Sequence, residues 1–411
     1  MSKKDTKEKK VKGEVLQEDI HLDIPEDEIW TYQVPGLAAP HVNKPFKYYN
    51  LKKAIFVIVI IIAVSLSIYF SVMALQNETF EYEQIANGYE FTKFSNTGYL
   101  DEIEIDYASD IEYIPGNNDP ETNFSVVKDK SKPIVSVRQF ALNCDDKIKT
   151  IKIGPDVEYV DEKAFYSCWA LQNIEVDENN PNYCDIDGVL YTKDKTQLLC
   201  YPCDHDEYLR QKYGYEKELY TDEITPEYQR DVQTYVVPST VTRLGVMCLN
   251  YANLREIYLP EGLKTIETLA VFKLHERKNE WETTPSLSNV YTYKNDNVTD
   301  THFTDAKTLG EVYLSLPEGL EFIGSDAFSY NQNLQYVYIP SSVKEIGHHA
   351  FWDTCYKEGG EIKGVAVMNV AVSEEDFASK TVGDNWIPQY DYMLFKKNIE
   401  INYSAQREAV K

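Results

Sequence analysis

Basic side chains are scarce in this sequence of 411 residues. It holds 41 lysines and arginines against 67 aspartates and glutamates, which gives a formal net charge of -26 at pH 7. Residues 1–53 are nearly balanced, with ten lysines and nine acidic residues, so the negative excess lies after residue 53. An acidic surface repels the phosphate backbone of DNA and RNA. We therefore predict that nucleic acid is not a partner.

The signatures of common catalytic sites are also missing. The seven histidines form no HExxH zinc motif, and the sequence contains no GxSxG elbow, no phosphate-binding Walker loop and no GxGxxG pattern. These motifs place a nucleophile, a metal or a nucleotide phosphate against its partners, and nothing in the sequence replaces them. We predict a protein that is not an enzyme and that carries no cofactor and no metal.

One cysteine motif offers an alternative to that prediction. Cys200 and Cys203 form a CxxC pair, with His205 close behind, and such pairs bind zinc or exchange disulfides. No second ligand pair follows at zinc-finger spacing, so structural thiols are the favoured interpretation. A disulfide among Cys184, Cys200 and Cys203 stays open, because the predicted compartment allows one. Seven cysteines are an odd number, so at least one thiol stays unpaired within a monomer.

The longest apolar run extends from Ala54 to Leu75 and holds 22 residues without a charge. As a helix rising ~1.5 Å per residue it reaches ~33 Å, which is enough for a hydrocarbon core of ~30 Å. A signal peptide cleaved at Ala74 is the alternative, because Val72-Met-Ala74 resembles a small-residue cleavage site. The run is long for a signal peptide and follows a long polar tail. We therefore predict a single transmembrane helix over residues 54–75.

Flanking charges give this predicted helix a direction. Four lysines precede it, and residues 29–53 contain no acidic residue. Glu78, Glu81 and Glu83 follow it, and the first lysine beyond it is Lys93. The positive-inside rule then predicts a cytoplasmic N-terminus and an extracytoplasmic domain over residues 76–411. The charge-mixed, lysine-rich start of the chain predicts a mostly disordered tail.

Residues 29–50 differ from the rest of the tail. They interleave aromatic residues with three prolines, which forbid a long helix. One interpretation is an interfacial segment that lies on the inner leaflet of the membrane. The other is a linear docking motif for a cytosolic partner, in which Trp30, Tyr32 and Pro35 would make the contact.

Beyond the apolar run, the sequence repeats itself. LGEVYLSLPEGLEFIGSDAF (309–328) and LQYVYIPSSVKEIGHHAF (334–351) share their apolar spacing, a proline and an Ala-Phe ending. The interval from Phe328 to Phe351 is 23 residues. A fixed period of this length is typical of a solenoid, in which each unit buries its apolar face only against its neighbours. We expect Phe351 to stack on Phe328 of the neighbouring coil.

Each unit should begin with a short strand, in which alternate side chains point inward and outward. Within residues 334–339 we expect Val337 and Ile339 to point into the core. The outward positions are then occupied by tyrosines in several units. The tyrosines that we assign to a ligand-binding stripe are Tyr258, Tyr313, Tyr336 and Tyr338, with the first three at equivalent sites. Aromatic anchors dominate binding hot spots. Tyrosine also simply suits strands, which is the alternative explanation.

These repeats resemble the BspA-like leucine-rich repeats of bacterial and some protist surface proteins. The resemblance covers roughly residues 134–370. It includes AFYSCWALQNIEVDENNPNYCDIDGVLYTKDKTQLLCYP (164–202), which is similar to that family's segment in which a β-hairpin follows a repeat. Val189–Tyr191 and Leu198–Tyr201 would be the hairpin strands. The resemblance implies a β-rich leucine-rich-repeat solenoid of the α/β repeat class that recognises a protein or a glycan.

The sequence therefore predicts a chain in four parts. They are a tail (1–53), a transmembrane helix (54–75), a juxtamembrane spacer or cap with short strands (76–130) and a solenoid (131–411) with insertions at 203–234 and 273–308 and a C-terminal cap. The favoured function is an anchored cell-surface binding or adhesion protein with an extracellular protein or glycan ligand. The alternative is a bitopic cell-envelope scaffold that is recruited through the aromatic-proline tail.

Overall fold

The computed structural model places part of the chain. The described residues are 79–95, 100–113, 124–142, 146–215, 225–277, 283–285, 289–293, 312–331, 334–352, 354, 357–358, 361–362, 366–387 and 399–407. All of the described residues belong to one compact unit, Leu75–Lys411. The predicted transmembrane helix and the tail, with its docking residues, lie outside the described residues. Among the described residues, no helix is both long enough and apolar enough to cross a membrane.

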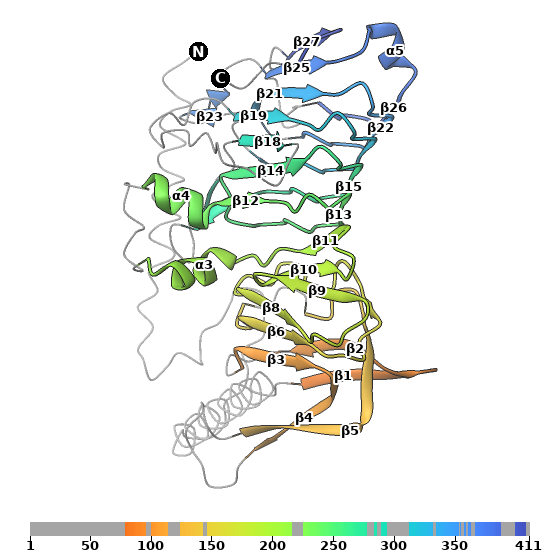
Figure 1. Cartoon of the computed structure of the whole chain (residues 1–411), viewed down its shortest axis with the longest axis vertical. Coiled ribbons are helices and arrows are strands. Elements are labelled where there is room, and N and C mark those ends of the chain that lie inside the picture. The colour runs from red at the N-terminus through yellow and green to blue at the C-terminus, as the bar shows by residue number, and fades with distance from the viewer. Residues whose placement is uncertain are drawn as a thin grey trace, which may run out of the picture. The chain divides into compact units, whose positions relative to one another are not determined.

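The repeats build one long parallel sheet, in the order β12-β14-β18-β19-β21-β25-β27 (Figure 1). Every neighbouring pair in it is parallel. The strands are β12 (Thr234–Val236), β14 (Glu256–Pro260), β18 (Asn289–Tyr293), β19 (Val312–Ser315), β21 (Leu334–Ile339), β25 (Ala366–Val370) and β27 (Ile399–Tyr403). Each coil of the chain contributes one strand, so the sequence period becomes the step from one strand to the next.

A second sheet of eight short strands runs along another side of the same coils. Its strands, in sheet order, are β26 (Thr381–Val382), β22 (Glu345–Ile346), β20 (Phe322–Ile323), β15 (Thr265–Ile266), β13 (Arg243–Leu244), β11 (Gln197–Cys200), β10 (Val189–Thr192) and β9 (Tyr183–Ile186). The pairs from β11 to β26 are parallel. The pair β10–β11 is antiparallel, which confirms the predicted hairpin.

The third side of the coils is made of turns, and backbone hydrogen bonds connect each turn to the turn of the next coil. Phe328 N donates to Ala350 O at 2.8 Å, and Tyr330 N donates to Trp352 O at 3.0 Å. Coils approach closely here: a Cβ on Gly347 would lie 2.3 Å from Ser325 N. Glycine is therefore required before this turn, because no side chain fits between the two backbones.

The N-terminal part of the described chain carries a different arrangement. One sheet holds β1 (Thr79–Ile85), β2 (Gly88–Ser95), β5 (Phe124–Val137) and β4 (Tyr107–Tyr113) in that order, with β7 (Tyr159–Val160) on β5. A three-stranded parallel sheet holds β3 (Glu102–Ile105), β6 (Thr150–Ile153) and β8 (Asn173–Val176). Because β3 pairs with β6, the ladder of repeats begins before residue 131, the expected start of the solenoid.

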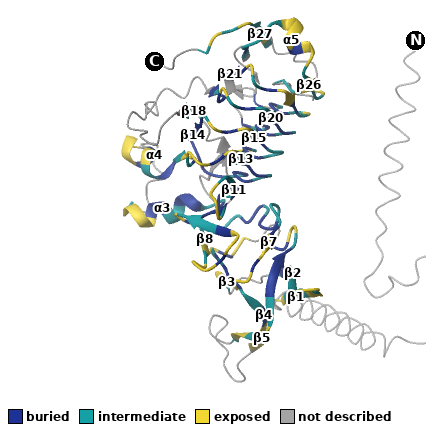
Figure 2. Cartoon of the chain, turned by 45° about the vertical axis from the view of Figure 1, so that its right-hand side comes forward, coloured by how far each residue is buried: buried dark blue, intermediate teal, exposed yellow. Residues whose placement is uncertain are grey.

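The two expected insertions have different structures. Residues 203–234 hold the helices α3 (His205–Tyr213) and α4 (Pro226–Val232), whose outer surfaces are exposed (Figure 2). Thr225 caps α4 through the Tyr228 N–H at 3.2 Å, and α3 ends at Gly214 with a φ of 76°. Shorter elements are the hairpins β16 (His275–Arg277) with β17 (Thr283–Pro285) and β23 (Lys357–Glu358) with β24 (Glu361–Ile362), and the helix α5 (Glu374–Ala378).

The segment 273–308 is more than an insertion, which corrects the sequence interpretation. Its residues Asn289–Tyr293 form β18, a full strand between β14 and β19. The sequence Asn-Val-Tyr-Thr-Tyr alternates as a strand should, and the side chain of Val290 is buried. It lacks the proline and the Ala-Phe ending of residues 309–328 and 334–351, so the sequence period did not reveal it.

The core has two large apolar clusters and a small third one, which is formed by Leu209, Tyr228 and Val232 of α3 and α4. One follows the seven-stranded sheet and includes Val337 and Ile339, as predicted, with exposures of 1% and 0%. The Phe328 and Phe351 rings stack in it at 5.4 Å between centroids and 5° between planes, which confirms the predicted contact. The other large cluster lies under β2 to β8. We call residues 79–176 the N-terminal block and residues 234–403 the C-terminal block.

Candidate functional site

The predicted tyrosine stripe lies on the outer side of the seven-stranded sheet. Because Ile257 and Leu259 of β14 point into the core, Tyr258 lies on the opposite side. It is nevertheless only 5% exposed, and Tyr338 is 9% exposed. Tyr336 is half-buried. The side chain of Tyr313 is outside the described set. We expected these tyrosines on the outer side of the sheet, but the rings of Tyr258 and Tyr338 are largely buried there.

The register of the stripe differs from the prediction. Tyr313 pairs with Tyr336, as expected. Tyr258 pairs instead with Tyr291 of β18, whereas Asn289 pairs with Tyr313. The predicted equivalence of Tyr258 with Tyr313 is therefore wrong, because the unrecognised strand β18 shifts the alignment by two residues. Tyr258 belongs to the row that continues through Ser315 to Tyr338.

Part of this outer side is covered by the end of the chain. Arg407 follows the last strand and reaches back across the sheet. Its Nε donates to Ser315 Oγ at 2.8 Å, and its Nη1 donates to Glu261 Oε1 at 2.7 Å. The guanidinium lies 5.9 Å from the Tyr338 ring centroid. Burial, and the Glu318 carboxylate that accepts the hydroxyl hydrogen bond, raise the pKa of Tyr338 to about 12. Tyr338 therefore belongs to an internal contact.

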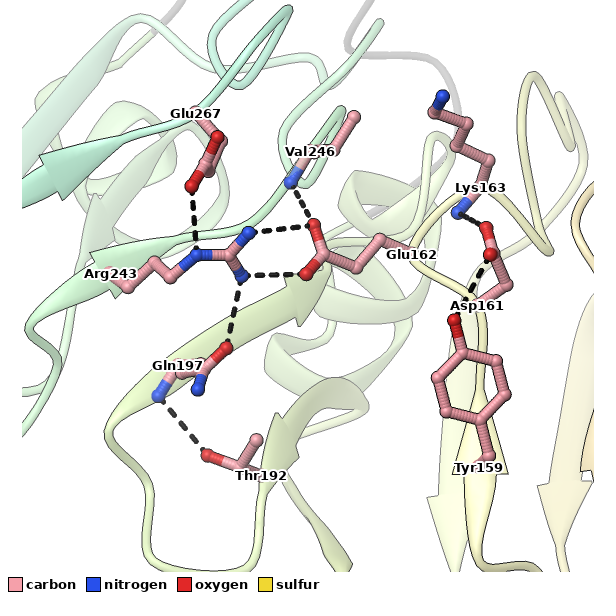
Figure 3. A network of polar contacts seen from close by, with 9 residues as sticks. All are labelled: Tyr159, Asp161, Glu162, Lys163, Thr192, Gln197, Arg243, Val246 and Glu267. Carbon is pink, nitrogen blue, oxygen red and sulfur yellow. Dashed lines mark hydrogen bonds and ion pairs between the residues drawn. The ribbon is translucent and has the colours of Figure 1, made fainter. Parts of the chain in front are cut away.

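A polar network joins the two blocks (Figure 3). Glu162, just after β7, accepts from Arg243 of β13 at 2.6 Å. Arg243 also donates to Glu267 at 3.0 Å and to Gln197 at 3.0 Å. The Val246 N–H donates to the second oxygen of Glu162. The side chains of Glu162 and Arg243 are each 25% exposed, so the pair is partly shielded from water. This geometry connects coils and offers no reacting group.

The CxxC motif lies beside this network. Cys200 and Cys203 line a small cavity of about 20 Å³, together with Ser167 and Asn250. Cys184, Cys200 and Cys203 are in the thiol state. Burial raises the pKa of the Cys200 thiol well above its usual range, so the thiolate that zinc or disulfide exchange needs is disfavoured.

His205 does not complete a metal site with these cysteines. Its Nδ1 lies 2.7 Å from the Gln172 carbonyl oxygen, and burial lowers its pKa to about 4. Across the described part of the chain, no group of three or more histidine, cysteine, aspartate or glutamate side chains has metal-binding geometry.

A row of aromatic rings on the turn side was not predicted. We call it the turn ladder, and its members are Trp169, Tyr251, Phe272, Tyr330 and Trp352. Successive ring centroids lie 4.4, 5.8, 5.3 and 5.0 Å apart. All five side chains are half-buried, so each ring keeps part of its surface in water. The row begins in the N-terminal block and continues through successive coils of the C-terminal block.

The sequence carried a signal for the turn ladder, but an irregular one. Phe272 and Trp352 are the second residue after a buried alanine of the turn, whereas Tyr330 is the third. Tyr251 and Tyr330 each have a φ of 61°, in the left-handed region. The alternating offset hides the row from a search for a fixed period.

The family of the chain can now be stated. Residues 89–185 and 227–357 match the model of the BspA type leucine-rich-repeat region, in six copies. The chain belongs to this family. The resemblance inferred from the repeats is confirmed, and the match begins well before residue 131. No protein of curated function matches this BspA type chain significantly.

Several solved structures are similar to this BspA type chain. A leucine-rich repeat protein from Eubacterium ventriosum is 17% identical over 64% of this chain and 61% of that one, with a TM-score of 0.35. The pneumococcal vaccine antigen PcpA is 18% identical, with coverages of 66% and 60% and a TM-score of 0.37. A leucine rich cell surface protein from Faecalibacterium prausnitzii is 19% identical, with coverages of 60% and 54% and a TM-score of 0.37. The chain thus spans about three fifths of the first two structures.

Proposed function

We propose that this BspA type protein is a membrane-anchored cell-surface binding or adhesion protein that presents its repeats to a protein or glycan ligand. One observation carries the proposal: the stack of coils holds a row of half-buried aromatic rings, the turn ladder, on its turn side. Solenoids bind through extended faces, and exposed aromatic surface marks interaction sites. We propose no catalytic step, because the polar groups described above hold coils together.

The membrane anchor in this proposal rests on the apolar run Ala54–Leu75 and its flanking charges. Its test is cysteine labelling on intact cells, with the label located by peptide mapping. An impermeant reagent should reach a cysteine placed at Ser341, an exposed position, but not one placed at Thr31. Labelling of Thr31→Cys alone would reverse the orientation, and release of the protein into the medium would favour cleavage at Ala74.

The binding role is tested with the full-length chain displayed on cells. Adhesion should be measured to extracellular-matrix proteins, mucins and cell-wall polymers, against cells without the chain. Specific, saturable adhesion to one class supports the proposal. The same incubations should be analysed for release of soluble fragments, since hydrolysis of any polymer would contradict the absence of enzymatic activity.

A second candidate is a bitopic envelope scaffold, favoured by Trp30, Tyr32 and Pro35 in the segment 29–50. A simple anchor has no need of an aromatic-proline motif beside the membrane. Deletion of residues 29–50 discriminates between the two candidates. An adhesion protein should keep its binding and its surface distribution, whereas a scaffold should lose its localisation pattern while its surface level stays constant.

A further inference from the structure

The turn ladder keeps its rings at the surface and not in the core. Phe328 and Phe351 are 1% and 0% exposed and stack in the core, whereas the five ladder rings are half-buried. The left-handed φ of Tyr251 and Tyr330 belongs to the turns themselves, because Leu269, Lys273 and His349 share it. Aromatic surface that stays exposed marks interaction sites.

The geometry of the ladder is periodic and rigid. Its rings follow the coils one by one, with centroids 4.4 to 5.8 Å apart. Backbone hydrogen bonds tie the same turns together, for example from Tyr251 N to Phe272 O at 3.1 Å. A row fixed in this way loses little conformational freedom on binding. It matches a ligand that is extended and that also repeats along its length.

The charges beside the ladder limit the chemistry of that ligand. The ammonium group of Lys273 lies 5.5 Å from the Tyr251 ring centroid. His349 lies 5.6 Å from the Trp352 ring, and Asp326 lies 4.0 Å from His349. A polyanion needs a row of basic side chains, and the net charge of -26 opposes it further. The surroundings of the ladder therefore fit an uncharged ligand.

The geometry of the ladder suits an extended ligand better than a globular protein. From Tyr251 to Trp352 the rings meet edge to face, at interplanar angles of 74° to 87°. Hot spots of protein interfaces sit in well-packed pockets, and the cavity lined by Ser167 and Met247 holds only about 20 Å³, too little for a side chain. Uncharged sugar rings instead pack their C–H faces on exposed aromatic rings.

We infer that the turn ladder is a binding track for an uncharged, extended polysaccharide, whose sugar rings pack on successive ladder rings. The inference rests on the proposed function, since it names the ligand class and the surface of a binding protein. It moves the main contact from the sheet tyrosines to the turn side of the coils.

The test uses the full-length chain in detergent micelles and three insoluble neutral polysaccharides: cellulose, chitin and mannan. The fraction that sediments with each polymer is measured over a range of polymer amounts. The variant is Y251N/Y330N, because asparagine tolerates a left-handed φ and so removes two rings without added strain. We expect retention on at least one polymer, weakened about tenfold in the variant, as for the loss of hot-spot aromatics.

A matched control is Tyr336→Asn, which removes one half-buried ring from the sheet side. It should bind like the unchanged chain, and urea unfolding should show that all three proteins are folded. Retention of none of the polymers, or equal retention of chain and ladder variant, would overturn the inference. So would binding through the ladder to soluble polygalacturonate, a polyanion, in place of the neutral polymers. If Tyr336→Asn alone weakens binding, the proposed function stands and the ladder inference fails.

Discussion

In the C-terminal block every neighbouring pair of the seven-stranded sheet is parallel, whereas the N-terminal block adds the antiparallel pairs β1–β2 and β4–β5. The difference follows from position in the stack. An interior coil buries both of its faces against equal neighbours, whereas the first described coil lies next to the hairpins of the N-terminal block. Terminal repeats therefore need a different structure, and hairpins supply one without a further repeat.

The same contrast appears in the polar contacts of the blocks. The edge strand β1 carries Glu81 and Glu83, paired with Lys93 of β2 and with Arg138. Charges on an edge strand discourage pairing with another chain. The C-terminal block instead buries apolar contacts between its coils, as in the Phe328–Phe351 stack. The N-terminal block thus closes one end of the solenoid, and the coils beyond it are bound mainly by apolar stacking.

The largest effect should come from a cavity in the C-terminal block. Phe328→Ala removes a ring that is 1% exposed and should lower the free energy of unfolding by ~3–5 kcal/mol. Urea unfolding is followed by tryptophan fluorescence in two forms of the protein. One form keeps Trp352 as its single tryptophan, and the other keeps Trp169. The Trp352 transition should move most, because neighbouring coils share the loss. Equal shifts at the two tryptophans would mean that the blocks unfold as one.

The next-largest effect is the change of stability with pH that His205 causes, in the segment between the two blocks. Burial lowers the pKa of His205 from its usual 6.5 to about 4. Between these values the unfolded chain binds more protons than the folded one. Stability should therefore fall as the pH drops below about 6.5, and the loss is complete below about 4. Over this range His205 accounts for ~3 kcal/mol.

The control for this pH dependence is His205→Gln, measured by urea unfolding at pH 7, 6, 5 and 4. The pKa of the neighbouring Asp206 is raised by burial, so its contribution has the opposite sign and adds stability as the pH falls. The difference between the two proteins isolates the histidine. Parallel curves across the range would contradict a neutral, buried His205.

A smaller effect is expected from the network that joins the blocks. Arg243→Met leaves Glu162 without its guanidinium, which in a fully buried pair costs ~3–5 kcal/mol. Both side chains are 25% exposed, so ~1–3 kcal/mol is expected here. The variant should also separate the Trp169 and Trp352 transitions. A double-mutant cycle with Glu162→Gln measures the pair itself, and a coupling near zero would assign the junction to apolar packing alone.

The parts of this structure that the sequence revealed are those with a regular period. Val337, Ile339 and the Phe328–Phe351 stack follow from an apolar spacing that repeats every 23 residues. The hairpin of β10 and β11 followed from the resemblance to known repeats. These features follow from the local sequence pattern, so they can be predicted without knowledge of any tertiary contact.

The parts that escaped depend on irregular coils or on backbone conformation. Strand β18 lacks the proline and the Ala-Phe ending of residues 309–328 and 334–351, and its presence between β14 and β19 places Tyr258 in the row of Tyr338. The turn ladder is irregular in the sequence, because Tyr330 is the third residue after the buried alanine of its turn, whereas Phe272 and Trp352 are the second. Arg407 reaches a contact 146 residues away, and no local pattern encodes such a distance.

The smallest effect compares one hydroxyl in each block. Tyr338→Phe removes the 2.8 Å hydrogen bond to Glu318 from a ring that is 9% exposed, and should cost ~0.5–1.5 kcal/mol. Tyr159→Phe removes a 3.2 Å bond to Asp161 from a ring that is 53% exposed, where water replaces the partner, and should cost under ~0.5 kcal/mol. Both are measured by urea unfolding with the tryptophan of the same block. A larger loss for Tyr159→Phe would mean that the exposed bond to Asp161 stabilises the N-terminal block more than the buried bond to Glu318 stabilises the C-terminal block.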